Sequence, residues 1–145
     1  MSDTYVFDTE AMIAFLYGEP GHERVASLLD DVFSGRVDGV LTETNATEVY
    51  YLVARFEGID DYPTATSLRI ADRDLRALSR QGVTIESADW RLAAEVKAAG
   101  RCSLADAFAV AHAFDRDATL ITGGDDDFDD LPVDVTIRRF RDYGV

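Results

Sequence analysis

Apolar positions along the chain follow two spacings that alternate, and this alternation predicts the class of fold. Short apolar runs, typical of buried strands, are followed by segments with apolar residues at i, i+3 and i+4, typical of amphipathic helices. The predicted strands are residues 5–7, 39–42, 83–85, 119–122 and 135–140. The predicted helices are residues 9–17, 23–33, 43–57, 64–78, 89–97 and 103–114. Strands alternating with helices predict an α/β fold, with a mainly parallel sheet covered by helices on both faces.

The length of the chain, 145 residues, fits a single domain that spans residues 1–145. A domain of this size buries roughly 68–70% of its unfolded surface, which is enough for one sheet with helices on both sides. No apolar run approaches the roughly 20 residues that a membrane-spanning helix needs. The opening segment, MSDTYVFD, lacks the basic start and apolar core of a signal peptide. We therefore expect a cytoplasmic protein without membrane contact.

Charge is the strongest compositional feature of the chain, which contains 28 acidic and 14 basic residues and has a formal net charge of −14. All of the bases except Lys97 are arginine. Such a surface repels itself unless salt screens it, and the Debye length falls to about 3 Å at 1 M salt. The composition therefore indicates a halophilic protein. It also argues against a general affinity for nucleic acid at low salt, so such a substrate must be held by metal ions and a few local arginines.

Cysteine and histidine are too scarce for the usual zinc sites or for a disulfide framework. Cys102 is the only cysteine, and His22 and His112 are the only histidines. His112 lies in the apolar helix over residues 103–114, where a core histidine is more common than a ligand, and we assign it no role. Any metal ion must therefore be held by oxygen atoms.

Two acidic residues in the first half of the chain stand where solvation alone explains them poorly. Asp8 comes directly after the first predicted strand and before the helix over residues 9–17. In a parallel sheet, ligands collect outside the carboxyl ends of the strands, so this carboxylate points into the usual site. The alternative is that Asp8 caps the helix. Glu48 lies at the margin of the apolar stripe of the third helix, and the alternative there is a rim residue that reaches water.

Two further acids follow in the second half. Asp106 lies in the helix over residues 103–114, and the residues three, four and seven positions further on are all apolar. The alternative for Asp106 is a capping box with Ser103, although that box normally uses Glu or Gln. Asp125 opens an acidic run after the strand over residues 119–122, and the alternative for most of this run is a solvated turn. A calcium loop of the EF-hand type is excluded, because it would need Gly at position 130 and Glu at position 136.

Four carboxylates at the same edge of a sheet have a common chemical consequence. They repel one another, and without a cation at least one of them would be pushed to bind a proton. Carboxylate oxygens suit Mg²⁺ or Mn²⁺ with open positions for water and phosphate. Metal ions held in this way activate water and stabilise both oxygens of an in-line phosphoryl displacement.

Around these acids the sequence resembles the PIN-domain ribonucleases, and its size and layout resemble the VapC-type toxins of toxin–antitoxin pairs. The matching segments are VFDTEAMIAFL around Asp8, LTETNATEVYYLVAR around Glu48, LADAFAVAHA around Asp106 and LITGGDDDF around Asp125. Together they span nearly the whole chain. The resemblance implies a PIN-like three-layer α/β/α fold and a catalytic site in which these four acids bind Mg²⁺ or Mn²⁺. It also implies cleavage of RNA, inhibition by a cognate antitoxin protein and a homodimer.

The fourth segment departs from the family pattern, since it has an extra glycine and three successive aspartates. Either Asp125 or Asp127 can therefore be the fourth ligand. Asp125 keeps the family's two-residue spacing to Phe128.

Two other functions remain as alternatives. The segment VFDTEA is similar to the nucleophile motif of haloacid-dehalogenase-like phosphatases, but Glu10 stands where that motif has a second Asp. Such an enzyme, like a receiver-type signalling domain, needs a lysine near a later strand end, whereas Lys97 lies in a predicted helix. The other alternative is a non-catalytic PIN-like fold that only binds a partner, which would not need Asp106 in an apolar helix.

Overall fold

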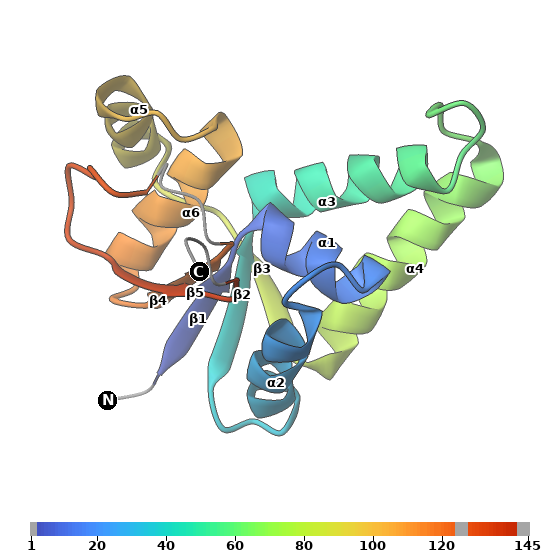
Figure 1. The fold of residues 1–145 in the computed structure, drawn as a ribbon, viewed down its shortest axis with the longest axis horizontal. Coiled ribbons are helices and arrows are strands. Elements are labelled where there is room, and N and C mark those ends of the chain that lie inside the picture. Colours follow the sequence, from blue (N-terminus) through green and yellow to red (C-terminus); the bar gives the residue numbers. More distant parts are fainter. Residues whose placement is uncertain (1–2, 124–127, 142–145) are drawn as a thin grey trace.

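The computed structural model describes residues 3–123 and 128–141, and within them the chain forms a five-stranded parallel sheet (Figure 1). The strands are β1 (Thr4–Phe7), β2 (Asp38–Thr42), β3 (Val83–Glu86), β4 (Thr119–Thr122) and β5 (Thr136–Arg139). They are arranged in the order β3-β2-β1-β4-β5, and every neighbouring pair is parallel. β1 is therefore the central strand, and the predicted α/β class with a mainly parallel sheet is confirmed.

Helices cover both faces of the sheet (Figure 1). They are α1 (Thr9–Tyr17), α2 (His22–Phe33), α3 (Glu43–Phe56), α4 (Ala65–Gln81), α5 (Trp90–Ala99) and α6 (Leu104–Asp115). One apolar core holds side chains of α1, α2, α3 and α4, and a second holds side chains of α5 and α6. The three-layer α/β/α arrangement is therefore confirmed. In the described part of the chain, no helix has the length and apolar character needed to cross a membrane.

Alternation along the strands explains why both faces of the sheet are buried. Val6 of β1 and Leu120 of β4 pack into the core with α5 and α6. Their neighbours Phe7 and Ile121 pack into the core with α1 to α4. Successive residues of a strand point to opposite faces, so a strand covered on both sides reads as a continuous apolar run.

The carboxyl ends of the strands lie at one edge of the sheet, and several helices begin near it. Asp8 caps α1 directly after β1, and Thr42, the last residue of β2, caps α3. Asp89 caps α5 shortly after the end of β3. This edge therefore gathers the polar side chains that end strands and begin helices, and it is the usual place for a site in a parallel sheet.

The segment after β5 packs against the turn between α1 and α2. Gly21 in this turn has φ of 88°, and a Cβ there would lie 2.5 Å from the Phe140 carbonyl oxygen. Only glycine fits such a close approach at positive φ. Phe140 is buried in the core with α1 to α4. The contact places the next residue, Arg141, beside the first helix.

Each predicted element is present, but only α1 and β4 have the predicted bounds, and the others differ by up to three residues at their ends. α2 begins at His22, one residue early, whereas α4 and α5 continue to Gln81 and Ala99. α4 ends before Gly82 and α5 ends before Gly100, and each glycine is the C-cap residue of its helix. β5 is shorter than predicted at both ends.

Candidate functional site

Asp8 is at the centre of the candidate site, and the fold holds both of its carboxylate oxygens. Its side chain is 1% exposed. The backbone N–H of Ala11 donates to Oδ1 over 2.7 Å, which makes Asp8 the N-cap of α1. The hydroxyl of Thr122, at the end of β4, donates to Oδ2. The capping role is therefore real, and it coexists with a burial that capping does not require.

Burial gives this carboxyl group unusual acid–base behaviour. Desolvation raises the pKa of Asp8 from 3.8 to about 8 and outweighs the hydrogen bonds from Thr122 and Ala11, which lower it. The negative charges of Asp106 and Glu10 raise the pKa of Asp8 further. A cation beside Asp8 would favour the ionised form instead. The raised pKa therefore comes mainly from burial, and the two neighbouring acids add to it.

α6 brings Asp106 close enough to Asp8 for their charges to interact. Asp106 is partly buried in the first turn of α6, and its backbone N–H donates to Ser103 Oγ over 3.2 Å. Ser103 therefore caps the helix, as the alternative explanation of this segment expected. The predicted burial of α6 is largely confirmed, because most of its residues are buried: Ala105, Ala107, Ala109, Val110, Ala111, His112 and Ala113.

Asn45 makes the direct link between α3 and α1, and Glu48 lies beyond it. Asn45 is fully buried, and its Nδ2 donates to Thr9 Oγ1 over 3.1 Å. Its backbone N–H donates to the hydroxyl of Thr42, the cap of α3, over 3.0 Å. Glu48 is partly buried about one turn further along the helix. Its part in a metal site stays a prediction.

The described residues do not by themselves form a complete metal site. Within residues 3–123 and 128–141, no three residues of the types His, Cys, Asp and Glu lie close enough together to hold an ion. Asp125 and Asp127 lie outside the described residues, so neither is placed relative to Asp8. Asp8 and Asp106 are the two predicted ligands whose charges the structure brings together. The four-acid set stays a prediction.

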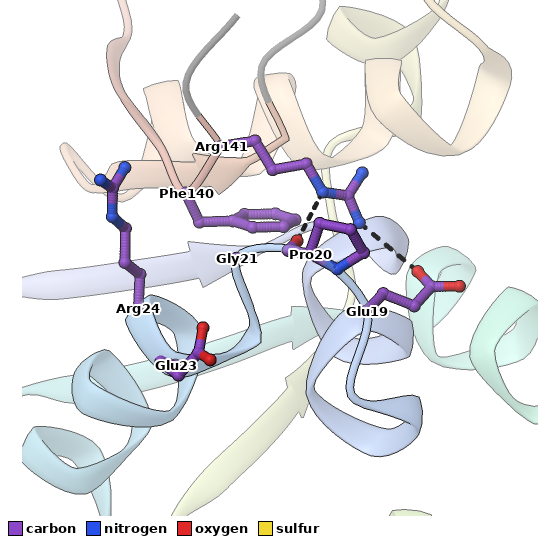
Figure 2. A pocket seen from close by; sticks show the side chains of 7 residues that line it. All are labelled: Glu19, Pro20, Gly21, Glu23, Arg24, Phe140 and Arg141. Atoms are coloured by element: carbon purple, nitrogen blue, oxygen red, sulfur yellow. Dashed lines mark hydrogen bonds and ion pairs between the residues drawn. The ribbon is translucent and has the colours of Figure 1, made fainter.

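Glu10, which sequence reasoning did not assign to the site, also faces this edge of the sheet. Its side chain lies against Gly123, where a Cβ would come within 2.6 Å of Glu10 Oε1. Arg141 forms an ion pair with Glu10. Arg141 also donates from Nε to the Pro20 carbonyl oxygen over 2.7 Å and lies 3.4 Å from Glu19 (Figure 2). The absence of a side chain at Gly123 leaves room for this second carboxylate near Asp8.

Local pattern could not have revealed the pair of Glu10 and Arg141, because 131 positions separate the two residues. One compositional signal was present, since three arginines stand close together at positions 138, 139 and 141 in a strongly acidic chain. Thr122 carried a weaker signal as the last residue of a predicted strand. The partner of such a residue depends on which strand lies beside it, and that is a property of the fold.

A hollow of about 810 Å³ lies next to this ion-pair network, between the α1–α2 turn and the segment after β5 (Figure 2). Its lining residues are Glu19, Pro20, Gly21, Glu23, Arg24, Phe140 and Arg141. Neither Asp8 nor Asp106 lines it, so it is distinct from the predicted metal site. Arg141 connects the two places, because it lines the hollow and pairs with Glu10.

His112 belongs to a different polar cluster. Its Nε2 lies 2.8 Å from Glu86 Oε1, and Arg116 donates to the same oxygen over 3.0 Å. Burial raises the pKa of Glu86, but the hydrogen bonds from His112 and Thr84 and the charge of Arg116 outweigh it, so the pKa lies below its usual value. His112 is thus a core histidine with a structural partner.

The fold is similar to those of several solved structures of VapBC and FitAB proteins. VapBC2 from Rickettsia felis bound to a promoter DNA fragment matches with a TM-score of 0.67 and 14% identity, over 94% of this chain and 98% of that one. DNA-bound VapBC from Salmonella typhimurium matches with a TM-score of 0.67 and 13% identity, over 97% and 99%. FitAcB from Neisseria gonorrhoeae matches with a TM-score of 0.61 and 16% identity, over 94% and 97%. At these identities the likeness shows the fold.

Sequence comparison gives the family directly. No curated protein is similar enough to the chain to count as a match. The sequence pattern of the PIN domain, in contrast, matches residues 5–134, which include β1, the central strand, and both Asp8 and Asp106. Because this match covers most of the chain, the protein belongs to the PIN domain family.

Proposed function

We propose that the protein is a metal-dependent endoribonuclease that hydrolyses RNA phosphodiester bonds and acts as the VapC-type toxin of a toxin–antitoxin pair. Its family supports nuclease chemistry, since PIN domains are nucleases. The observation that carries the proposal is the buried carboxyl group of Asp8, whose pKa desolvation raises to about 8, with the charge of Asp106 as a further cause. The family match also removes the support for a haloacid-dehalogenase-like phosphatase.

The proposed metal ligands are Asp8, Glu48, Asp106 and Asp125, with Asp127 as the alternative to Asp125. They offer oxygen atoms only, which fits Mg²⁺ or Mn²⁺. The fit also rests on the electrostatics of Asp8, because a carboxyl group that resists ionisation in the metal-free fold is one that a cation would ionise. When bound, the metal supplies an activated water and stabilises the oxygens of an in-line phosphoryl displacement.

Other side chains at this edge would orient the acids before substrate arrives. Thr122 and the Ala11 N–H fix the two oxygens of Asp8, so its rotamer is set by the fold. Asn45 ties the first turn of α3 to α1 and so limits how far the helix that carries Glu48 can move. Preorganisation of this kind reduces the rearrangement needed during the reaction.

An antitoxin partner is supported by similarity and by the surface of the chain. The similar solved structures are of VapBC and FitAB proteins, several of them bound to DNA. Tyr17 at the end of α1 and Phe56 at the end of α3 form an exposed edge-to-face pair with ring centroids 5.4 Å apart. Exposed apolar side chains of two neighbouring helices fit the apolar face of a protein segment. A homodimer and a cytoplasmic, halophilic setting belong to the same proposal.

The test is cleavage of labelled RNA by the purified protein, with Mg²⁺ or Mn²⁺ and with a chelator, over a range of monovalent salt. We expect cleavage with metal only, and inhibition by the product of a small neighbouring gene. A protein that is folded and binds metal but cleaves no RNA would overturn the nuclease proposal and favour a PIN-like binding module. Cleavage that the neighbouring gene product does not affect would overturn the toxin–antitoxin part alone.

A further inference from the structure

Trp90 is the single tryptophan of the chain, and it is held out into solvent by a fixed helix end. It is the first residue of α5 and is 66% exposed. Its backbone is well anchored, since the Asp89 carboxylate accepts from the N–H groups of Arg91 and Leu92 over 3.0 and 3.2 Å. Tryptophan is highly buried on average, so this exposed ring on an anchored helix end is available to a ligand.

Contacts between neighbouring elements place the loop that leads to Trp90 at the same edge of the sheet as Asp8. The loop between β3 and α5 is bonded through Ser87 to Glu43, the first residue of α3. Asn45, in the same turn of α3, is bonded in turn to the first residue of α1. β3 lies two strands from β1, at about 4.8 Å per strand, and ends at Glu86. The four residues from Glu86 to Trp90 span at most about 3.5 Å each, so Trp90 lies within about 25 Å of Asp8. A short stretch of RNA can span this separation.

The segment that carries Trp90 is locally basic in a strongly acidic chain. Residues 90–101 contain Arg91, Lys97 and Arg101 against one acid. The guanidinium carbon of Arg91 lies 5.3 Å from the centroid of the Trp90 ring, and Arg91 and Arg101 are both exposed. In the part of the chain that the structure describes, other arginines form ion pairs, among them Arg36, Arg73, Arg76, Arg116, Arg139 and Arg141.

We propose that Trp90 is a stacking platform for an unpaired base of single-stranded RNA whose backbone continues across the carboxyl edge of the sheet to Asp8. The inference rests on the proposed ribonuclease function and states how the substrate is held. Every base has a π face, so stacking accepts any sequence. The Arg91 guanidinium would contact a phosphate next to the stacked base, and Arg101, beyond the far end of α5 and about 15 Å away, would contact a phosphate further along the strand.

Stacking also resolves the conflict between the charge of this protein and that of its substrate. A net charge of −14 repels RNA at low salt. High salt screens the repulsion, but it weakens phosphate contacts at the same time, because binding through phosphates depends on the release of counterions. Contact between a base and an aromatic ring does not depend on charge. It therefore persists under the salt conditions that the composition indicates.

An exposed tryptophan also suits a protein interface, but the surroundings of Trp90 favour RNA. The strongest protein contacts are ringed by residues that exclude water. The contact that the structure gives the Trp90 ring is with a cation, the exposed Arg91 guanidinium. Exposed apolar side chains such as Ile59 and Tyr62 belong to the connection between α3 and α4, at the far end of the molecule from α5 (Figure 1). That hairpin is the better surface for a protein partner.

Tryptophan fluorescence tests the proposal directly, because the whole signal comes from Trp90. The wild-type protein in chelator is titrated with an unstructured RNA oligonucleotide and with an abasic ribose-phosphate strand of the same length. A dye on each strand reports occupancy by anisotropy. At equal occupancy, RNA is expected to quench the Trp90 fluorescence and the abasic strand to leave it unchanged.

Variants measure how much the ring contributes. Trp90→Ala is expected to weaken RNA binding by about 5- to 150-fold, and Trp90→Phe by less, since a phenyl ring keeps a smaller stacking face. Tyr62→Ala removes a similarly exposed ring from the α3–α4 connection and is the matched control, with unchanged RNA affinity expected. The loss in Trp90→Ala should be the same at low and high salt, whereas the loss in Arg101→Gln should shrink as salt rises.

Two results overturn the proposal: RNA binding that leaves the Trp90 fluorescence unchanged, and wild-type RNA affinity in folded Trp90→Ala. Intact RNA affinity combined with loss of self-association or antitoxin binding would assign Trp90 to a protein interface instead. If Trp90→Ala does not fold, the wild-type titration and Trp90→Phe decide.

All binding is measured without metal, so quenching by RNA in a protein that never cleaves it would refute the nuclease and keep the stacking site. RNA cleavage by a protein whose Trp90 fluorescence does not change when RNA binds would refute the stacking site and keep the nuclease.

Discussion

The hydroxyl of Thr122 donates a hydrogen bond to the carboxylate of Asp8, so the last residue of β4 orients the residue that follows β1. Ala11 holds the other carboxylate oxygen from the opposite side of the same group. A carboxylate has about four acceptor sites, and the hydrogen bonds from these two described residues use one on each oxygen. The contacts that fix Asp8 therefore leave acceptor sites for the proposed metal ion.

Asp8→Asn should abolish metal-dependent RNA cleavage while the protein stays folded. The amide oxygen can still accept from Ala11, but the charge that would hold the metal is lost. Cleavage is measured with matched Mg²⁺ or Mn²⁺, and Asp38→Asn, an exposed acid at the start of β2, is the matched control. Wild-type rates in Asp8→Asn would remove Asp8 from the site.

The metal-free protein should lose stability relative to Asp8→Asn as the pH rises. Desolvation raises the pKa of folded Asp8 from 3.8 to about 8, so the folded state binds this proton more tightly than the unfolded state. The resulting stabilisation is complete below about pH 4 and is lost as the pH rises to about 8. Denaturant unfolding of both proteins in chelator at constant salt checks this. Parallel pH curves would show that Asp8 has no raised pKa.

Asp106→Ala separates a structural role from membership of the acid cluster. If Asp106 only supports the helix end, the change should cost about 0.5–2 kcal/mol with or without metal. If it belongs to the cluster, its removal relieves repulsion, and the metal-free variant should be no less stable than wild type. Wild type should then gain about 2.7 kcal/mol from metal at a hundredfold excess over the dissociation constant, and the variant much less.

Thermal melting in high monovalent salt, first with chelator and then with Mg²⁺ or Mn²⁺, decides between these outcomes. We expect the cluster result, because the charge of Asp106 already acts on Asp8 in the fold. A variant that is less stable in chelator and gains as much from metal as wild type would contradict it.

Asp125→Asn should damage metal-dependent cleavage more than Asp127→Asn. Asp125 has the family's spacing to Phe128, and Phe128 is buried in the core with α5 and α6. The two variants are compared by cleavage rate over a metal titration. The reverse order would move the fourth ligand to Asp127.

Arg141→Gln should destabilise the protein by about 1–3 kcal/mol, because the Arg141 guanidinium is mostly buried and holds both Glu10 and the Pro20 carbonyl. In the double variant Glu10→Gln/Arg141→Gln the loss should be smaller than the sum of the two single losses. Arg141→Lys should recover only part of it, since one ammonium cannot match the fork of a guanidinium. Additive losses in denaturant unfolding would show that the pair contributes nothing.

Local chemistry made several elements predictable. The helix over residues 9–17 and the strand over residues 119–122 have the predicted bounds. Asp8 caps the helix, and Gly18 ends it in the left-handed conformation. Asp8 itself could be explained in two ways, as a cap or as a site residue, and the structure gives it a cap's hydrogen bond together with the burial of a site residue.

Long-range partners were beyond the reach of the same reasoning. The order of strands in the sheet sets which strand ends meet, and it decides that Thr122 lies beside Asp8. Likewise, Glu10 is paired by an arginine from the other end of the chain, which no local spacing predicts. The acids could be identified from their setting in strands and helices, whereas the residues that orient and neutralise them depend on tertiary packing.

The order of strands also determines when the site can exist during protein synthesis. The central strand β1 is made first, but its neighbour β4 comes late, and 114 positions separate Asp8 from Thr122. Until residues 119–122 have left the ribosome, the Asp8 side chain lacks the strand that covers it and the hydroxyl that orients it. A nascent chain that already contains Asp8 therefore has no assembled site until β4 has been made and has paired with β1.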